Sequence, residues 1–113
     1  MNKFLVAILV LNIVITLIVI LFYFVRPKTI NPIVGYRTKL SMKNQVNWDV
    51  SQNYFFKNWI FLLPIIYLTQ ILMLFGEIPF KFIGYIVFSE FIVFTLALIF
   101  ATEKKLKKID MIK

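Results

Sequence analysis

Three long apolar runs restrict what this chain can fold into. They cover residues 4–25, 56–75 and 82–101. As a helix, the first would extend about 33 Å, enough to cross the hydrocarbon core of a bilayer. Hydrophobic residues make up 61% of the 113 residues, so a soluble domain of this length could not shield them from water. The runs predict an all-α integral membrane protein with three transmembrane helices, forming one membrane domain over residues 1–113.

The first run has the features of an uncleaved span and not of a signal peptide. Lys3 supplies a basic start, but the run is too long for a signal peptide. The residues that follow, around Arg26, are bulky and offer no small-residue cleavage site, and Pro27 is expected to end the helix. The second and third runs are joined by a tight turn at Gly76-Glu77-Ile78-Pro79, which predicts an antiparallel helical hairpin.

Basic residues predict the orientation. Of the 13 lysines and arginines, only Lys3 and Lys81 fall on the side of the N-terminus and the turn. The others lie in the loop of residues 26–55, just after it at Lys57, or in the tail of residues 102–113. The positive-inside rule places the loop and tail in the cytoplasm and the N-terminus on the opposite side of the membrane. The net charge of +8 favours contact with anionic headgroups over nucleic acid.

The only long polar stretch, residues 31–52, separates the first two spans. Ser41 is a candidate N-cap for a helix that starts at Met42, with an apolar residue recurring every fourth position. Two interpretations stay open for this helix. It either lies in the cytoplasmic interface as an amphipathic segment or extends the second span, in which Pro64 is expected to cause a kink.

Three polar side chains fall inside the predicted spans. Glu90 and Gln70 each lie about 16 Å from the cytoplasmic end of their helix, and Asn12 lies about 20 Å from it. One intramembrane polar layer is therefore predicted, with a protonated Glu90 donating to one of the two amides. This layer either fixes the register of the helices or forms a proton-responsive or ligand-responsive site.

The composition of the chain offers few side chains of the types that catalyse reactions. The chain contains no cysteine and no histidine, which removes thiol nucleophiles, the commonest general base and the commonest zinc ligands. Its three glycines are too widely spaced for a phosphate-binding loop. We expect no enzyme activity, no metal and no cofactor.

The polar stretch carries the one motif with a specific spacing, G-x-R-T-x-x-S-x-x-N-x-x-x-W. It is formed by Gly35, Arg37, Thr38, Ser41, Asn44 and Trp48, preceded by Asn31 and including Tyr36. With the hydrophobic hairpin that follows, residues 20–105 resemble the SdpI family of bacterial membrane proteins. A single span precedes the motif, as in the short form of the family. The resemblance implies immunity against a secreted toxic peptide, or a receptor that sequesters a cytoplasmic repressor.

The chemistry of the motif allows two roles. Gly35 permits a left-handed bend, and Arg37 offers a planar donor fork for a phosphate, a carboxylate or helix-end carbonyls. Arg37 either ties the loop to the ends of the spans or recognises a peptide, a headgroup or a cytoplasmic partner. We expect the binding residues to be Asn31, Gly35, Tyr36, Arg37, Thr38, Ser41, Asn44 and Trp48.

Three functions remain after these exclusions. The first is protection against, or sensing of, a membrane-active peptide toxin. The second is a small transport or channel component that uses the polar layer, which requires a homo-oligomer because three helices are too few for a pore. The third is a structural membrane subunit without a ligand of its own.

Overall fold

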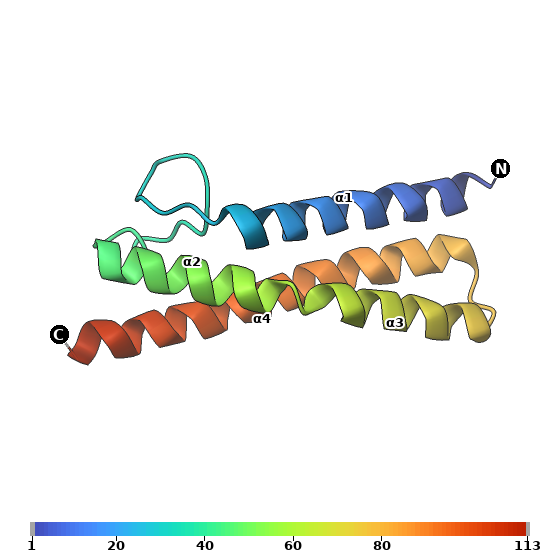
Figure 1. Cartoon of the computed structure of the whole chain (residues 1–113). Coiled ribbons are helices and arrows are strands. Elements are labelled where there is room, and N and C mark those ends of the chain that lie inside the picture. The colour runs from blue at the N-terminus through green and yellow to red at the C-terminus, as the bar shows by residue number, and fades with distance from the viewer. Residues whose placement is uncertain (1, 113) are drawn as a thin grey trace.

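A computed structural model describes residues 2–112 and is helical throughout its regular structure (Figure 1). The helices are α1 (Lys3–Val25), α2 (Gln45–Trp59), α3 (Leu62–Phe75) and α4 (Phe80–Ile112). Three segments are long and apolar enough to cross a membrane: Lys3–Val25, Gln45–Phe75 and Phe80–Met111. The predicted all-α architecture with three spans is confirmed.

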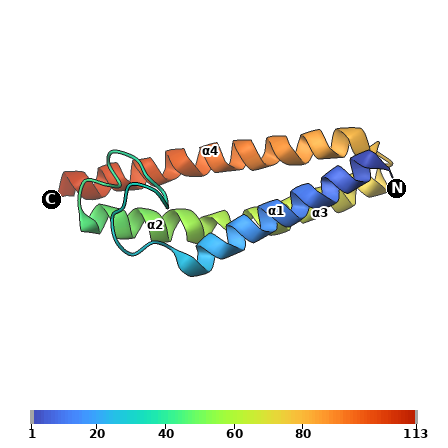
Figure 2. The same cartoon turned by 90° about the horizontal axis from the view of Figure 1, so that it is seen from above.

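The helices form an elongated bundle of 54 × 23 × 18 Å. Helices α2 and α3 follow one another along α4 and run antiparallel to it, and α1 packs against α2 and α4 (Figures 1 and 2). The N-terminus lies beside the turn between α3 and α4, at what we call the hairpin end (Figure 1). The C-terminus lies near the start of α2 and the loop of residues 26–44, at what we call the loop end (Figure 1).

Helix α1 presents a narrow buried face and a wide lipid-facing surface. The side chain of Asn2 caps its start by accepting hydrogen bonds from the backbone N–H groups of Phe4 (2.8 Å) and Leu5 (3.4 Å). Only three of its side chains are buried, and their spacing of seven and four residues places them on one face: Ile8, Ile15 and Val19. Leu11 and Phe22 are half-buried against the core, and most of the remaining apolar side chains are exposed, as a helix in contact with lipid requires.

The second span is broken one turn before its proline. Helix α2 ends at Trp59, and α3 begins at Leu62 after a turn at residues 60–61. Pro64 has no N–H to donate to the carbonyl of residue 60, so the regular ladder cannot continue there. The backbone N–H of Leu63 bonds to this carbonyl instead, at 3.2 Å. The kink expected at Pro64 is thus a short break between two helices.

The polar helix starts later than the sequence suggests. Its N-cap is Asn44, whose side chain accepts from the backbone N–H of Asn47 at 2.8 Å, and not Ser41 with a start at Met42. Helix α2 runs lengthwise along α4 and continues the direction of α3 (Figure 1). A helix lying in the interface is not confirmed, and the arrangement matches the alternative in which α2 extends the second span.

Helix α4 is a single helix that includes most of the predicted tail. It covers Phe80–Ile112, about 50 Å at 1.5 Å per residue, whereas a hydrocarbon core is about 30 Å thick. Its last turns therefore extend beyond the core together with the start of α2. The turn before α4 contains Glu77 in the left-handed conformation (φ 57°), and the N–H of Ile78 bonds to the carbonyl of Met73 at 3.0 Å.

Candidate functional site

The loop end is organised by Gln52, a fully enclosed side chain on α2. Its Oε1 accepts a hydrogen bond from the backbone N–H of Tyr36 at 2.8 Å, and its Nε2 donates to the carbonyl of the same residue at 2.7 Å. The amide thus pairs with both polar groups of one peptide residue, as a neighbouring β-strand would. We call Gly35, Tyr36, Thr38, Ser41, Gln52 and Glu103 the loop cluster.

Gly35 allows this pairing for two reasons. Its φ of +114° is a conformation that side chains with a Cβ rarely adopt. A Cβ at this position would also lie 2.7 Å from Gln52 Oε1 and 3.0 Å from Pro27 Cγ. The glycine predicted to permit a bend is therefore required both by the backbone conformation and by the closeness of its neighbours.

Glu103 on α4 accepts two hydrogen bonds from the loop. The hydroxyl of Tyr36 donates to its Oε2 at 2.7 Å, and the hydroxyl of Thr38 donates to the same oxygen at 2.9 Å. The Tyr36 ring also packs against Phe55, with 4.8 Å between ring centroids. Burial and the neighbouring Glu103 carboxylate raise the pKa of the Tyr36 hydroxyl far above its usual range, so it remains a donor.

Ser41 and Thr38 close a small turn inside the cluster. The backbone N–H of Thr38 donates to Ser41 Oγ at 2.8 Å, and the backbone N–H of Ser41 donates to Thr38 Oγ1 at 3.1 Å. The Ser41 hydroxyl lies 2.9 Å from the carbonyl of Thr38 and 3.2 Å from that of Tyr36. Because this hydroxyl is fully committed to the loop, it is not free to cap the following helix.

Trp48 joins α2 to the end of α1. Its indole N–H donates to the carbonyl of Pro27 at 3.0 Å, and the side chain is completely buried. It packs inside the loop cluster, with a ring carbon 3.4 Å from the position of a Cβ on Gly35.

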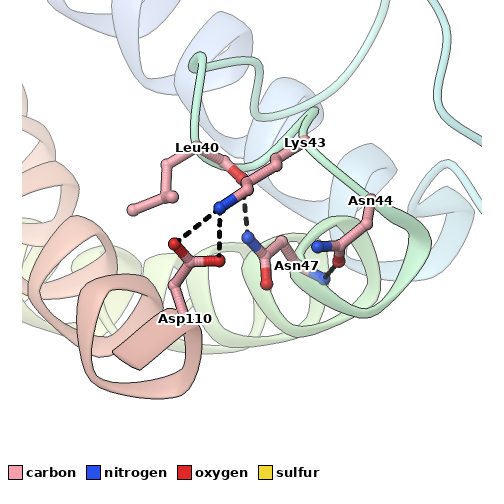
Figure 3. A network of polar contacts seen from close by, with 5 residues as sticks. All are labelled: Leu40, Lys43, Asn44, Asn47 and Asp110. Atoms are coloured by element: carbon pink, nitrogen blue, oxygen red, sulfur yellow. Dashed lines mark hydrogen bonds and ion pairs between the residues drawn. The ribbon is translucent and has the colours of Figure 1, made fainter. Parts of the chain in front are cut away.

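A second contact with α4 lies nearer the C-terminus (Figure 3). The Lys43 ammonium bonds to both carboxylate oxygens of Asp110, at 2.8 and 3.0 Å. Beside it, the Asn47 amide donates to the carbonyl of Leu40 at 3.0 Å, and Asn44 caps α2 (Figure 3). Because the Lys43 side chain is 56% exposed, this ion pair adds little stability.

The remaining two predicted site residues differ from the rest. The Asn31 side chain accepts from the backbone N–H groups of Ile33 (3.0 Å) and Val34 (2.7 Å), which shapes the tip of the loop. Arg37 is exposed, and within residues 2–112 its side chain makes no hydrogen bond or ion pair. Of the two roles open for Arg37, the tie to the spans has no contact to support it.

Gln52 and Glu103 are missing from the residues predicted from the sequence. A signal for Glu103 exists, because it directly precedes the basic run of residues 104–108 and is one of only two acids beside that run, with Asp110. It also lies on one helical face with Ile99, Leu106 and Asp110. Gln52 gives no such signal, since it is one of several amides in a polar stretch.

The predicted polar layer is only partly assembled. Asn12 and Gln70 form a reciprocal amide pair, with Nδ2 to Oε1 at 2.9 Å and Nε2 to Oδ1 at 2.8 Å. The hydroxyl groups of Thr16 and Tyr67 bond to each other in the same interface between α1 and α3. Glu90 makes no hydrogen bond to either amide within residues 2–112, although all three residues lie deep within their helices.

Glu90 instead lines a groove between α3 and α4. The groove has a volume of about 590 Å³ and an almost entirely apolar lining, formed by Leu62, Ile65, Tyr85, Ile86, Ser89, Glu90, Val93, Phe94 and Ala97. The Oε1 atom of Glu90 is buried and has no hydrogen-bond partner among the described residues. A buried carboxyl oxygen without a donor costs free energy, which a donor in a bound molecule would offset. Asn12 and Gln70 line a different groove of about 440 Å³.

Comparison with known protein families shows which family this chain belongs to. The model of the SdpI/YfhL protein family matches residues 28–102, which include the loop motif, α2, α3 and most of α4. The chain belongs to the SdpI/YfhL family. No curated protein and no solved structure matches it. The SdpI/YfhL match begins after α1 and ends next to Glu103, so most of the loop cluster lies within the shared region. The protein is accordingly an SdpI-type membrane protein.

Proposed function

We propose that this SdpI-type protein protects a bacterial cell from a membrane-active peptide toxin, or senses such a peptide, through the groove around Glu90. The observation that carries the proposal is the buried, unpartnered Oε1 of Glu90 in a lipid-facing groove of about 590 Å³. Lipid chains can fill the groove but cannot donate to this oxygen. A peptide helix that carries an amide, hydroxyl or ammonium group can do both, because donors are scarce within a membrane.

The loop end serves as a rigid platform in this proposal. Its contacts hold the loop and α2 against α4, the helix that supplies most of the groove lining, and the basic residues favour a cytoplasmic location for it. The unpaired guanidinium of Arg37 is available there to a headgroup or a cytoplasmic partner such as a repressor. This role requires no chemical reaction, which fits a chain without histidine or cysteine.

The transport alternative has weaker support. Asn12 and Gln70 satisfy each other, and they line a different groove from Glu90. A continuous polar path would need all three side chains to face one cavity. The separation of the two grooves therefore favours peptide recognition over transport.

Survival of cells challenged with a toxin tests the proposal. Cells that express the intact chain are exposed to the secreted peptide toxins of the strain that carries it, beside cells with Glu90→Leu. We expect the intact chain to raise survival and the leucine variant to lose most of that protection. Glu77→Gln is the matched control, since this exposed acid lies in the turn and outside the groove. An intact chain that gives no protection would contradict the immunity role, and a fully protective leucine variant would contradict the role of the groove.

A further inference from the structure

A third cavity, distinct from both grooves described above, lies where α1 ends beside α2. It has a volume of about 220 Å³ and is lined by Phe24, Arg26, Pro27, Lys28, Asp49, Gln52 and Asn53. We call it the α1–α2 cleft. Just below it, the rings of Phe22 and Phe56 stack with their centroids 5.0 Å apart. The cleft therefore lies where the apolar residues of α1 give way to charged ones, which is the depth of lipid headgroups.

Opposite charges line this cleft without pairing. Arg26 and Lys28 enter from the end of α1, and Asp49 enters from α2. The only ion pair within residues 2–112 is the one between Lys43 and Asp110, so neither cation of the cleft is bound to Asp49. The cavity consequently presents two cations and one carboxylate to the same cleft, which is open to the outside at Lys28 and Asp49.

Each charged group retains capacity for a ligand. One guanidinium N–H of Arg26 donates to the carbonyl of Tyr23, which leaves the other N–H groups of the fork available. Lys28 is exposed, and its ammonium has no hydrogen-bond partner in the described chain. Asp49 accepts from the Gln45 amide through Oδ1 at 2.7 Å, and its Oδ2 remains for a second donor.

We propose that the α1–α2 cleft binds the phosphoethanolamine headgroup of a membrane lipid, with the phosphate on Arg26 and Lys28 and the ammonium on Asp49. Guanidinium and ammonium groups suit a phosphate, and a carboxylate suits a primary ammonium that donates hydrogen bonds. The volume of the cleft equals about seven water molecules at about 30 Å³ each, which is close to the number of heavy atoms in this headgroup. Phe24, 76% exposed beside the cleft, offers apolar surface for an acyl chain.

Other common headgroups fit the charges less well. Phosphatidylglycerol has no cation, so its phosphate would leave Asp49 facing a second negative charge. Phosphatidylcholine has a quaternary ammonium that cannot donate a hydrogen bond, and the cleft has no aromatic cage of the kind that binds such groups. The arrangement therefore selects a phosphate combined with a primary amine.

Lipid binding to the purified full chain in detergent tests this assignment by native mass spectrometry. The probes are phosphatidylethanolamine, phosphatidylglycerol and phosphatidylcholine with identical acyl chains. We expect the intact chain to retain the ethanolamine lipid best. Asp49→Asn, which keeps an acceptor for Gln45, should reduce that preference about tenfold, as the loss of one charge-assisted hydrogen bond predicts. Asp49→Lys should shift the preference to phosphatidylglycerol.

The controls separate this site from general attraction to charge. Asp110→Asn removes an acid at the same end of the bundle but outside the cleft, and it should leave the lipid preference unchanged. Soluble glycerophosphoethanolamine should compete only weakly, because it lacks the acyl chains that Phe24 contacts. Equal retention of the three lipids would overturn the proposal, as would an equal effect of Asp49→Asn and Asp110→Asn. If the soluble headgroup competed as strongly as the lipid, the proposal of a lipid ligand would be wrong. The ligand would then be a free phosphate that carries a primary amine.

Discussion

Gln52 shows how one side chain can hold a loop without regular structure. Its amide pairs with both the N–H and the carbonyl of Tyr36, at 2.8 and 2.7 Å, in a place where water is excluded. Leaving either backbone group unpaired would cost about 1–3 kcal/mol. Because the amide both donates and accepts, neither a glutamate nor a leucine of similar size can replace it.

At the same scale, Gly35→Ala should destabilise the fold by about 1–3 kcal/mol, the range for a residue held in a sparsely populated conformation. The new Cβ would meet Gln52 Oε1 at 2.7 Å, at a φ of +114°. Urea unfolding in detergent, followed by tryptophan fluorescence, measures the change. Gly84→Ala is the matched control, since its Cβ would meet only Ile8 Cγ1, at 3.7 Å, and it should be neutral or stabilising by up to about 1 kcal/mol. Equal losses in both variants would contradict the role assigned to Gly35.

Tyr36 makes the stability of the fold depend on pH in the alkaline range. Burial and Glu103 raise the pKa of its hydroxyl in the folded protein, so the folded state holds this proton more tightly than the unfolded state. The resulting stability is complete below about pH 10, the pKa of an unfolded tyrosine, and above it falls by about 1.4 kcal/mol per pH unit. The free energy of unfolding should therefore decline less steeply above pH 10 in Tyr36→Phe. Parallel pH profiles for the two proteins would rule out this linkage.

At the scale of helices, the Asn12–Gln70 pair joins α1 to α3. Either single substitution to leucine leaves one amide without its partner in an apolar interface, whereas the double substitution removes both polar groups. A double-mutant cycle on the free energy of unfolding should give a coupling of about 0.6 kcal/mol, and at most about 1.7 kcal/mol. Thr69→Leu serves as a control for placing leucine on α3, since its hydroxyl bonds to the carbonyl of Ile65 and takes no part in the Asn12–Gln70 pair. Strictly additive effects of the two leucines would mean that the pair contributes no stability.

The sequence predicts where the helices lie along the chain better than it predicts which residues of different helices contact one another. Long apolar runs decide the three spans and the hairpin, because a helix satisfies all of its backbone hydrogen bonds within one segment in lipid. The start of α2 was predicted at the wrong residue, since Ser41 and Asn44 are both good caps and only the fold commits Ser41 to Thr38. Glu90 was expected in the polar layer from its depth, but depth says nothing about the rotation of a helix about its axis. That rotation directs Glu90 into another groove.

The candidate site, too, could be predicted only in part, because a single sequence does not show which distant residues come into contact. The motif residues Gly35, Thr38 and Ser41 stand out by type and spacing, and the structure places them together in the loop cluster. Glu103, which accepts hydrogen bonds from Tyr36 and Thr38, lies on α4, far along the chain. A pairing across such a separation leaves no local pattern in a single sequence, which is why it appears only in the three-dimensional structure.

At the scale of the whole molecule, the two ends of the bundle differ in character. The bundle is 54 Å long, and a hydrocarbon core of about 30 Å cannot enclose it. The loop cluster and the ion pair between Lys43 and Asp110 lie at the loop end, with nearly all basic residues. The hairpin end carries a short turn and the start of α1 (Figure 1). The proposed platform for a cytoplasmic partner therefore depends on the loop end facing the cytoplasm.

This orientation can be measured directly, because the chain has no cysteine of its own. Single cysteines are introduced by Lys39→Cys in the loop, Met111→Cys near the C-terminus and Glu77→Cys in the turn, all at exposed positions. Bacteria that express each variant are treated with a membrane-impermeant maleimide before and after permeabilisation. The account predicts that Glu77→Cys reacts in intact cells and that Lys39→Cys and Met111→Cys react only after permeabilisation. Labelling of Lys39→Cys in intact cells would contradict it.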